Sequence, residues 1–282
     1  MPPGGLSQCS FDPASIQCKA GQESNACLTA PQTLALRKIY EGPRDRWGHQ
    51  VFPGYLPGAE EGNGGWTTWI TGSQPKKSLM ALFGIGYFSQ IVYGRADWDD
   101  SGFDLETDLR AAVEKTAQAL DATDPNLDPF RARGGKLIVY HGWQDPAIPA
   151  VSTINYYEDV VARLGRRNAD AFIRLYMAPG VQHCAGGPGA DSFGQMDDWS
   201  SDDAAHSLRV ALEQWVDKGA APSAVIASKF VGEGPARTMT RPLCPYPQEA
   251  RYSGRGDAND AASFTCAPPA RDKSSDKARG DR

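Results

Sequence analysis

Two short apolar runs separated by a helical pattern constrain the fold of this chain most. Lys136–Tyr140 and Ala171–Met177 are rich in β-branched and other apolar residues, which is typical of buried strands. Ser152–Leu164, between them, repeats apolar residues at helical spacing, and a second helical pattern follows over Ala204–Lys218. Strand, helix, strand and helix joined by short links predict an α/β fold, with a mostly parallel sheet and flanking helices.

A carboxylate and an imidazole follow the two predicted strands. Asp145 lies shortly after the first strand, and His183 lies shortly after the second. Because parallel strands end at one edge of a sheet, we expect the two side chains to meet there. An imidazole held by a buried carboxylate is the pair that takes a proton from a hydroxyl nucleophile. In the alternative interpretation, Asp145 only bonds backbone in a Gly-x-x-Asp-Pro turn and His183 is a solvated surface group.

The other histidines are weaker candidates for a base. His141 ends the first strand and is a rival, although its position favours packing or hydrogen bonding near the Asp145 turn. His206 opens the predicted helix over 204–218 and is expected to face solvent. His49 lies in a loop-rich region, where the sequence indicates no supporting acid.

The first 125 residues differ in character from the α/β part. They are rich in turns, in a chain of 282 residues with 30 Gly and 21 Pro, and residues 1–30 predict a loop. Helices are predicted over Pro31–Tyr40, Ser78–Tyr93 and Asp104–Leu120. The change of pattern falls near residues 124–133. Residues 268–282 mix both charge signs without an apolar period and predict a disordered tail.

Composition excludes several classes of protein. A net charge of -5 without a basic stripe argues against a nucleic-acid partner. No segment approaches the roughly 20 apolar residues of a membrane span, so no membrane partner is expected. No Cys/His metal-binding spacing is present, so no metal site is predicted. The 40% hydrophobic content is enough to bury a core.

Aromatic residues gather in the irregular part. Trp66, Trp69 and Phe83 are candidates for the lining of a substrate pocket, together with Tyr87 and Phe88. The alternative is that these side chains are simply the core of a small subdomain.

The six cysteines suggest a protein that forms disulfides. Bridges that close short irregular loops are typical of exported proteins, although reduced buried cysteines in a cytosolic protein are an alternative. The sequence does not fix the connectivity. Pairing neighbours along the chain gives Cys18–Cys27 and Cys244–Cys266 and leaves Cys9 and Cys184 alone. Cys244 and Cys266 are expected to bracket a polar C-terminal loop.

Several segments, taken together, resemble the tannase and feruloyl esterase family of α/β-hydrolases, over about Cys9–Cys266. The segments are Cys9–Pro13, Gln17–Cys18, Cys27–Gln32, Gly134–Trp143, Asp145–Pro146, Ile148–Pro149, Asn155–Tyr157, Arg174–Leu175, Pro179–Gly180, His183–Cys184, Gly186–Gly189, Trp215–Val216 and Arg241–Pro247.

The resemblance implies that Asp145 is the acid and His183 the base of a catalytic triad. The serine should precede Asp145 on a Gly-x-Ser-x-Gly turn, and the sequence contains no such turn. The resemblance also implies that Cys184 pairs with a cysteine beside that serine, and that Cys9 has a partner in the same absent stretch. The family's calcium loop would match Met1–Gln8, which has no acidic residue, so no cofactor is expected.

We therefore expect a partial α/β-hydrolase with an irregular, loop-rich lid. Residues 1–125 would be the lid, 126–267 the C-terminal part of the hydrolase domain, and 268–282 the tail. The expected function is serine-type hydrolysis of small aromatic esters, feruloyl or galloyl, with a missing N-terminal half supplying the nucleophile. The alternative is a non-catalytic or inactive truncated module that binds a ligand or docks with a serine-bearing half. The cysteines favour a secreted or periplasmic protein, although no signal peptide is visible.

Overall fold

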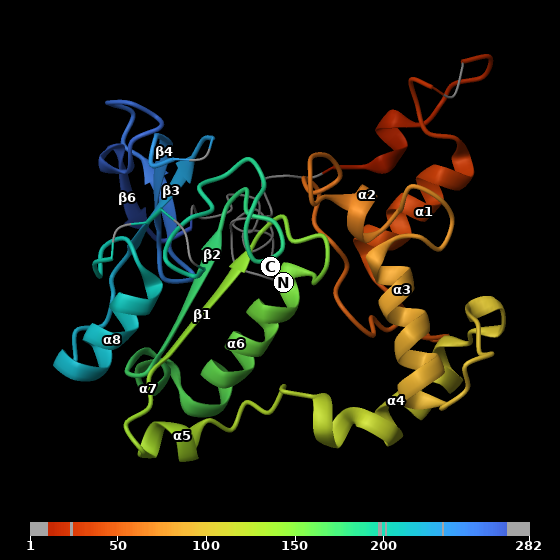
Figure 1. Cartoon of the computed structure of the whole chain (residues 1–282), viewed down its shortest axis with the longest axis horizontal. Coiled ribbons are helices and arrows are strands. Elements are labelled where there is room, and N and C mark those ends of the chain that lie inside the picture. Colours follow the sequence, from red (N-terminus) through yellow and green to blue (C-terminus); the bar gives the residue numbers. More distant parts are fainter. Residues whose placement is uncertain (1–10, 23–24, 197–198, 201, 233, 270–282) are drawn as a thin grey trace, which may run out of the picture.

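The computed structural model describes residues 11–22, 25–196, 199–200, 202–232 and 234–269. Its centre is a parallel pair of strands, β1 (Leu137–Gly142) and β2 (Ile173–Ala178), with Leu137 opposite Ile173. Helix α6 (Ala150–Leu164) and the short α7 (Arg166–Asp170) connect the two strands (Figure 1). The predicted strand–helix–strand unit is therefore confirmed.

The two strands are covered on both faces. Leu175 and Met177 of β2 share a buried cluster with Ile154 and Val160 of α6. The alternate β2 residues, Tyr176 and Ala178, pack instead with Leu208 and Ala211 of α8 (Leu208–Lys218). Successive side chains of a strand point to opposite faces, so α6 and α8 lie on opposite sides of the pair. Burial on both faces explains why the strand sequences are apolar runs rather than alternating patterns.

Helix α8 begins later than the sequence predicts. The expected start at Ala204 is wrong, because residues 203–206 form a turn. Asp203 accepts the backbone N–H groups of Ala205 and His206, and the Ser207 hydroxyl then caps the helix. Asp and Ser side chains that bond nearby backbone favour a turn and a cap over a helix interior.

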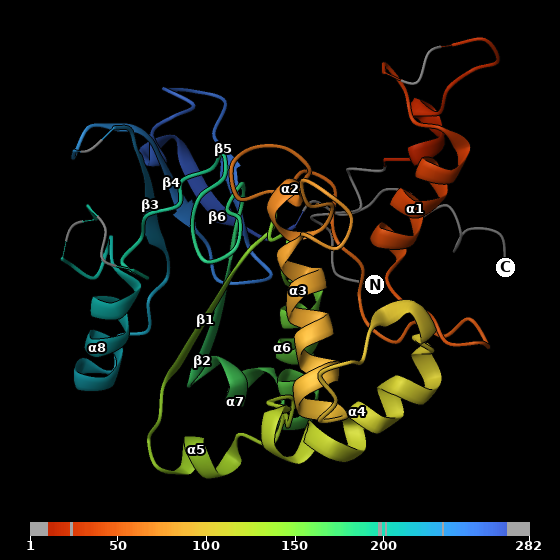
Figure 2. The same ribbon diagram turned by 45° about the vertical axis from the view of Figure 1, so that its right-hand side comes forward.

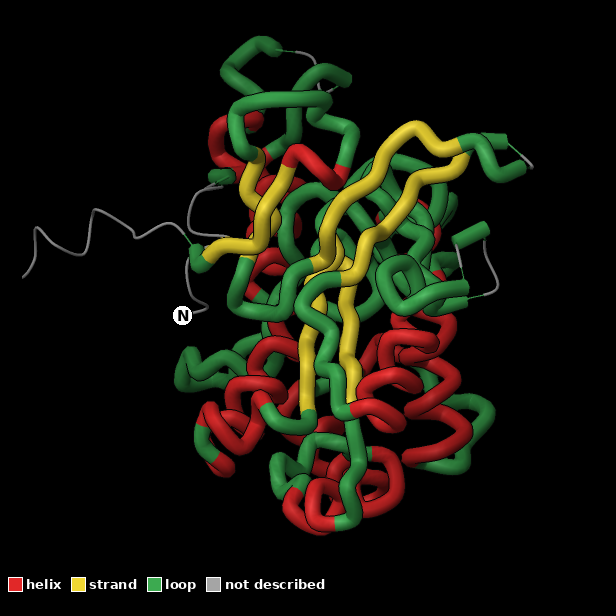
Figure 3. The backbone as a smooth tube through the Cα atoms, turned by 90° about the vertical axis from the view of Figure 1, so that its left-hand side faces the viewer, coloured by secondary structure: helices red, strands yellow, loops and turns green. Residues whose placement is uncertain are grey.

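The C-terminal region consists of strands that the sequence did not reveal. β3 (Val225–Phe230) pairs with β4 (Arg237–Leu243), and β5 (Glu249–Tyr252) pairs with β6 (Phe264–Ala267), both antiparallel (Figure 3). The prediction of a polar loop between Cys244 and Cys266 is therefore wrong. β5 and β6 are too short and too polar to give an apolar run, and their pairing is completed by cross-strand contact of Tyr252 with Phe264.

The N-terminal part is helical and loop-rich, and Figure 2 shows it beside the strand-containing part. Helices α1 and α4 confirm the predicted segments, with Thr29 and Asp104 as their N-caps. The predicted helix over 78–93 is present but divided, because α3 continues into a π-helical turn. The elements are η1 (Pro13–Ile16), α1 (Ala30–Glu41), α2 (Trp66–Trp69), α3 (Leu79–Gly86), η2 (Tyr87–Val92), η3 (Asp100–Gly102), α4 (Leu105–Leu120) and α5 (Asp128–Ala132).

Both predicted disulfides are present. Cys18 bonds Cys27 next to η1, and Cys244, directly after β4, bonds Cys266 in β6. Cys184 is free and exposed. Cys9, the Met1–Gln8 segment and residues 270–282 lie outside the described residues. None of the helices in the described ranges is long and apolar enough to cross a membrane.

Candidate active site

The two loops that follow β1 and β2 are tied together at one edge of the strand pair. Trp143 donates its backbone N–H to the Ala178 carbonyl at 3.0 Å, and Gln144 donates to Val181 at 3.1 Å. A Cβ at Gly142 would lie 2.2 Å from the carbonyl oxygen of Val181, so only glycine permits this approach. The loops carrying the predicted acid and base are thus adjacent, as the parallel arrangement predicts.

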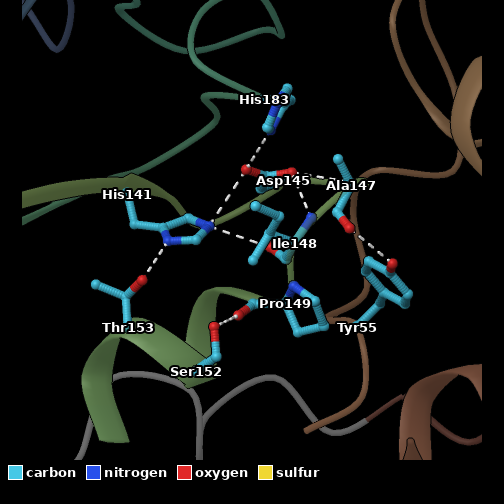
Figure 4. Close-up of polar contacts among 9 residues, drawn as sticks. All are labelled: Tyr55, His141, Asp145, Ala147, Ile148, Pro149, Ser152, Thr153 and His183. Carbon is cyan, nitrogen blue, oxygen red and sulfur yellow. Dashed lines mark hydrogen bonds and ion pairs between the residues drawn. The ribbon is translucent and has the colours of Figure 1, made fainter. Parts of the chain in front are cut away.

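Asp145 and His183 are in direct contact. Nδ1 of His183 lies 3.0 Å from Oδ2 of Asp145 (Figure 4). An ionised carboxylate only accepts hydrogen bonds, so Nδ1 carries the proton and donates it to Oδ2. Asp145 is 7% exposed, whereas the side chain of His183 is 31% exposed. The other ring nitrogen, Nε2, makes no hydrogen bond to the described residues and is free to accept a proton.

The carboxylate of Asp145 is fixed on both oxygens. Oδ1 accepts the backbone N–H groups of Ala147 at 2.8 Å and Ile148 at 2.9 Å, and Oδ2 faces both His183 and His141. Burial by itself raises the pKa of Asp145, but the contacts with His141, Ile148, His183 and Ala147 outweigh it and lower the pKa below the ordinary 3.8. Asp145 therefore stays ionised at neutral pH and accepts the Nδ1–H of His183.

His141 has the structural position that its place in the sequence favours. It is 9% exposed and lies between the Asp145 turn and α6 (Figure 4). Nε2 lies 3.1 Å from the Ile148 carbonyl oxygen, and Nδ1 lies 2.7 Å from the hydroxyl of Thr153 in α6. Both ring nitrogens are engaged, so His141 is not available as the base.

The loop carrying His183 is held by residues that sequence reasoning missed. Nζ of Lys229 in β3 donates to the Gly187 carbonyl at 2.7 Å and lies 3.0 Å from Oδ2 of Asp191. Asp191 also accepts the Gly186 N–H at 3.0 Å. Asp191 and Lys229 are 38 residues apart, and neither lies in a motif, so nothing in the sequence indicated this anchor.

Of the five candidate pocket residues, Trp69 and Phe83 lie near the base. The ring of Trp69 packs against the His183 ring with a centroid distance of 4.8 Å, and Phe83 lies 6.3 Å from Trp69. Phe83 is 61% exposed and presents an open aromatic face. Trp66 lies elsewhere: it is 6% exposed and packs against Tyr40 of α1, as expected of a core residue. A substrate-binding role for Trp69 and Phe83 stays a prediction.

A largely apolar hollow adjoins the Asp145 turn. It has a volume of about 700 Å³ and lies between the helical part and the strand-containing part. Tyr55, Ile70 and Met80 line it from one side, and Ile148 and Pro149 line it from the other. The acid of the pair is therefore next to a space with apolar walls.

The remaining histidines lie outside the site. The prediction that His49 has no supporting acid is wrong, because Nδ1 lies 3.0 Å from Oδ2 of Asp45 in the same exposed turn. His206 keeps 26% of its side chain exposed and contacts Asp203. Over the described ranges, no group of three or more His, Cys, Asp or Glu side chains could hold a metal ion.

This chain is similar to known proteins over most of its length. The family model described as "Tannase and feruloyl esterase" matches residues 4–267. An uncharacterised esterase of Xanthomonas campestris is 38% identical over 92% of this chain and 49% of its own length. A mono(2-hydroxyethyl) terephthalate hydrolase of Piscinibacter sakaiensis is 32% identical over 93% of this chain and 47% of its own length.

A solved structure shares the fold. The crystal structure of an esterase from Aspergillus oryzae superposes with a TM-score of 0.81 at 29% identity, over 93% of this chain and 51% of that one. The chain spans about half the length of the curated relatives it matches. The match to the family model over nearly the whole sequence, together with the α/β core, shows that this chain belongs to the tannase and feruloyl esterase family of carboxylic ester hydrolases.

Proposed function

We propose that this chain carries the acid and the base of a serine-type hydrolase for aromatic esters, and that the nucleophile lies outside these 282 residues. The observation that carries the proposal is the 3.0 Å contact of His183 Nδ1 with Asp145 Oδ2, which leaves Nε2 free. A buried carboxylate that fixes the tautomer of an imidazole and stabilises its cation is the acid–base half of a catalytic triad.

In the proposed reaction, Nε2 of His183 takes the proton of the nucleophilic hydroxyl as its oxygen bonds to the ester carbonyl carbon. The tetrahedral intermediate then expels the alcohol, which receives the proton from His183. The acyl group stays bonded to the nucleophilic oxygen as an acyl-enzyme. Water repeats the sequence, with His183 again as base, and releases the carboxylic acid. Asp145 stays ionised throughout and stabilises the transient imidazolium.

The substrate class is argued from the relatives and from the aromatic residues beside the base. The mono(2-hydroxyethyl) terephthalate hydrolase and a probable feruloyl esterase B-2 of Aspergillus terreus, 30% identical, are both named after aromatic carboxylic esters. Trp69 packs edge-on against His183 and Phe83 lies next to Trp69, so an aromatic acyl group near Nε2 would meet aromatic rings. We assign Trp69 and Phe83 to substrate binding and leave Trp66 to the core.

The domain assignment forms part of the proposal: residues 1–125 as lid, and residues 126–267 as the C-terminal part of a hydrolase domain. Tyr55 of the proposed lid donates to the Ala147 carbonyl at 2.9 Å, next to the acid, and Trp69 covers the base. β1 pairs with β2 alone among the described strands, although its apolar sequence suits a central strand. We place a further strand, which carries the nucleophile, at the edge of β1 that no described strand pairs with. The two disulfides support a secreted or periplasmic location.

The test is hydrolysis of methyl ferulate by the chain alone and after co-expression with a serine-bearing half, such as the N-terminal half of the Xanthomonas esterase. We expect no turnover alone and turnover in the complex. His183→Ala or Asp145→Asn should reduce it by about 10⁴-fold. His206→Ala, which removes a histidine outside the site, is the control and should leave the rate unchanged.

Two results would contradict the proposal. Hydrolysis by the chain alone that disappears in His183→Ala would place the nucleophile within these residues. A folded, active complex whose rate survives His183→Ala would remove His183 from the chemistry.

A further inference from the structure

His141 brings a second imidazole to the same carboxylate oxygen that faces the base. Oδ2 of Asp145 lies 3.0 Å from Nδ1 of His183 and 3.2 Å from Nε2 of His141. Figure 4 shows the two rings on either side of the carboxylate, with Thr153 beyond His141. Oδ2 of Asp145 therefore contacts both His183 and the buried ring of His141, which has no part in the proposed ester chemistry.

The surroundings of His141 define where its proton lies. Nε2 faces only acceptors, the Ile148 carbonyl at 3.1 Å and the Asp145 carboxylate, so Nε2 must carry a hydrogen. Nδ1 faces the Thr153 hydroxyl at 2.7 Å, and a hydroxyl is able to donate. Neutral His141 is thus satisfied on both nitrogens, with one N–H shared between the carbonyl and the carboxylate.

A single carboxylate cannot balance two imidazolium ions. His141 is 9% exposed and loses more solvation on charging than His183, whose side chain is 31% exposed. Positive charge on His183 therefore costs less desolvation than positive charge on the more buried His141.

The charge of Asp145 also acts on two tyrosines, Tyr55 and Tyr140, and both are neutral near pH 7. Burial, and then the charge of Asp145, raise the pKa of Tyr55 to about 12. Burial also raises the pKa of Tyr140, followed by the effects of Cys184 and Asp145. Asp145 is thus the anion that these rings share.

We propose that His141 is a positioning residue: its Nε2–H holds and partly neutralises the oxygen that Asp145 presents to His183, and so limits how strongly His183 binds a proton. Thr153, by donating to Nδ1, keeps His141 in the tautomer that does this. The consequence for catalysis rests on the proposed function, because it concerns the same acid–base pair. A base that holds its proton less tightly is free at lower pH and returns the proton to the leaving alcohol more readily.

The experiment uses the intact chain and requires no turnover. The chain has four histidines, so proton–carbon correlation spectra of the imidazoles can be assigned with single variants and titrated. His141→Asn keeps an amide near Thr153 but cannot reach Asp145, and should raise the pKa of His183 by about half a unit to one unit. His141→Gln places an amide N–H near the position of Nε2 and should restore the original value to within about 0.3 unit.

His206→Gln is the matched control, because it removes a histidine that also contacts an aspartate but lies outside the site. It should leave the His183 titration unchanged. An unchanged or lowered pKa in a folded His141→Asn chain would overturn the proposal, as would equal shifts in the Asn and Gln variants. If neither variant folds, a titration of the unmodified chain in which His141 charges before His183 would overturn it instead. Because the readout is a titration, this test is decided separately from ester hydrolysis.

Discussion

Lys229 anchors the loop that carries His183, and removing its charge tests how that loop is held. Nζ contacts the Gly187 carbonyl at 2.7 Å and the Asp191 carboxylate at 3.0 Å. The side chain of Lys229 is 25% exposed and that of Asp191 is 16% exposed, so the pair is partly shielded from water. Lys229→Met removes both contacts and keeps the aliphatic stem.

The magnitude follows from this partial burial. A hydrogen bond to a charged group contributes about 1.5–3 kcal/mol, and breaking a fully buried ion pair costs about 3–5 kcal/mol. Because Lys229 and Asp191 still reach solvent, we expect Lys229→Met to lower the free energy of unfolding by about 2 kcal/mol. At about 2–4 °C for each kcal/mol in a chain of this size, the Tm should fall by about 4–8 °C.

Thermal unfolding followed by circular dichroism measures the effect in Lys229→Met, Asp191→Asn and the double variant. The double variant should be about 1 kcal/mol more stable than the sum of the single effects predicts. Lys76→Met is the matched control, because Lys76 pairs with Asp100 at the surface with 55% of its side chain exposed, and its Tm should not change. Additive single effects, or equal Tm values for Lys229→Met and Lys76→Met, would refute the reasoning.

Three further predictions follow from the described contacts. The pKa of Asp145 is lower in the folded chain than its ordinary 3.8, so ionised Asp145 stabilises the fold at pH values above 3.8. This stabilisation is lost as the pH falls through the lower pKa of the folded chain. Asp145→Asn should therefore flatten the decline of Tm measured from about pH 6 to about pH 3, and an unchanged decline would contradict this. Trp69→Leu should shift the imidazole proton resonances of His183, whose ring is 4.8 Å away, and leave those of His206 in place. Removing a disulfide should lower the free energy of unfolding measured in urea, and by more for the longer loop. The expected loss is about 3.4 kcal/mol for Cys244–Cys266, with a separation of 22 residues, and about 2.6 kcal/mol for Cys18–Cys27, with a separation of 9. The reverse order would count against the loop-entropy argument.

The local patterns of the sequence predicted the central strand–helix–strand unit and the contact at its edge. The apolar runs that became β1 and β2 act over a few residues, so they can be recognised without the fold. Since parallel strands end at one edge, the same patterns also predicted the meeting of Asp145 with His183. The two disulfides were predictable because each closes a local loop.

Only the tertiary structure decided the contacts between distant segments. Three features depend on packing that no local periodicity records: the anchor of Lys229 on Asp191, the edge-on contact of Trp69 with His183, and the strands β5 and β6. The same holds for His141, whose residue type and position were visible but whose second contact to Asp145 was not. Local propensity depends on neighbours along the chain, whereas a shared carboxylate oxygen or a partly buried ion pair forms only when folding brings distant segments together.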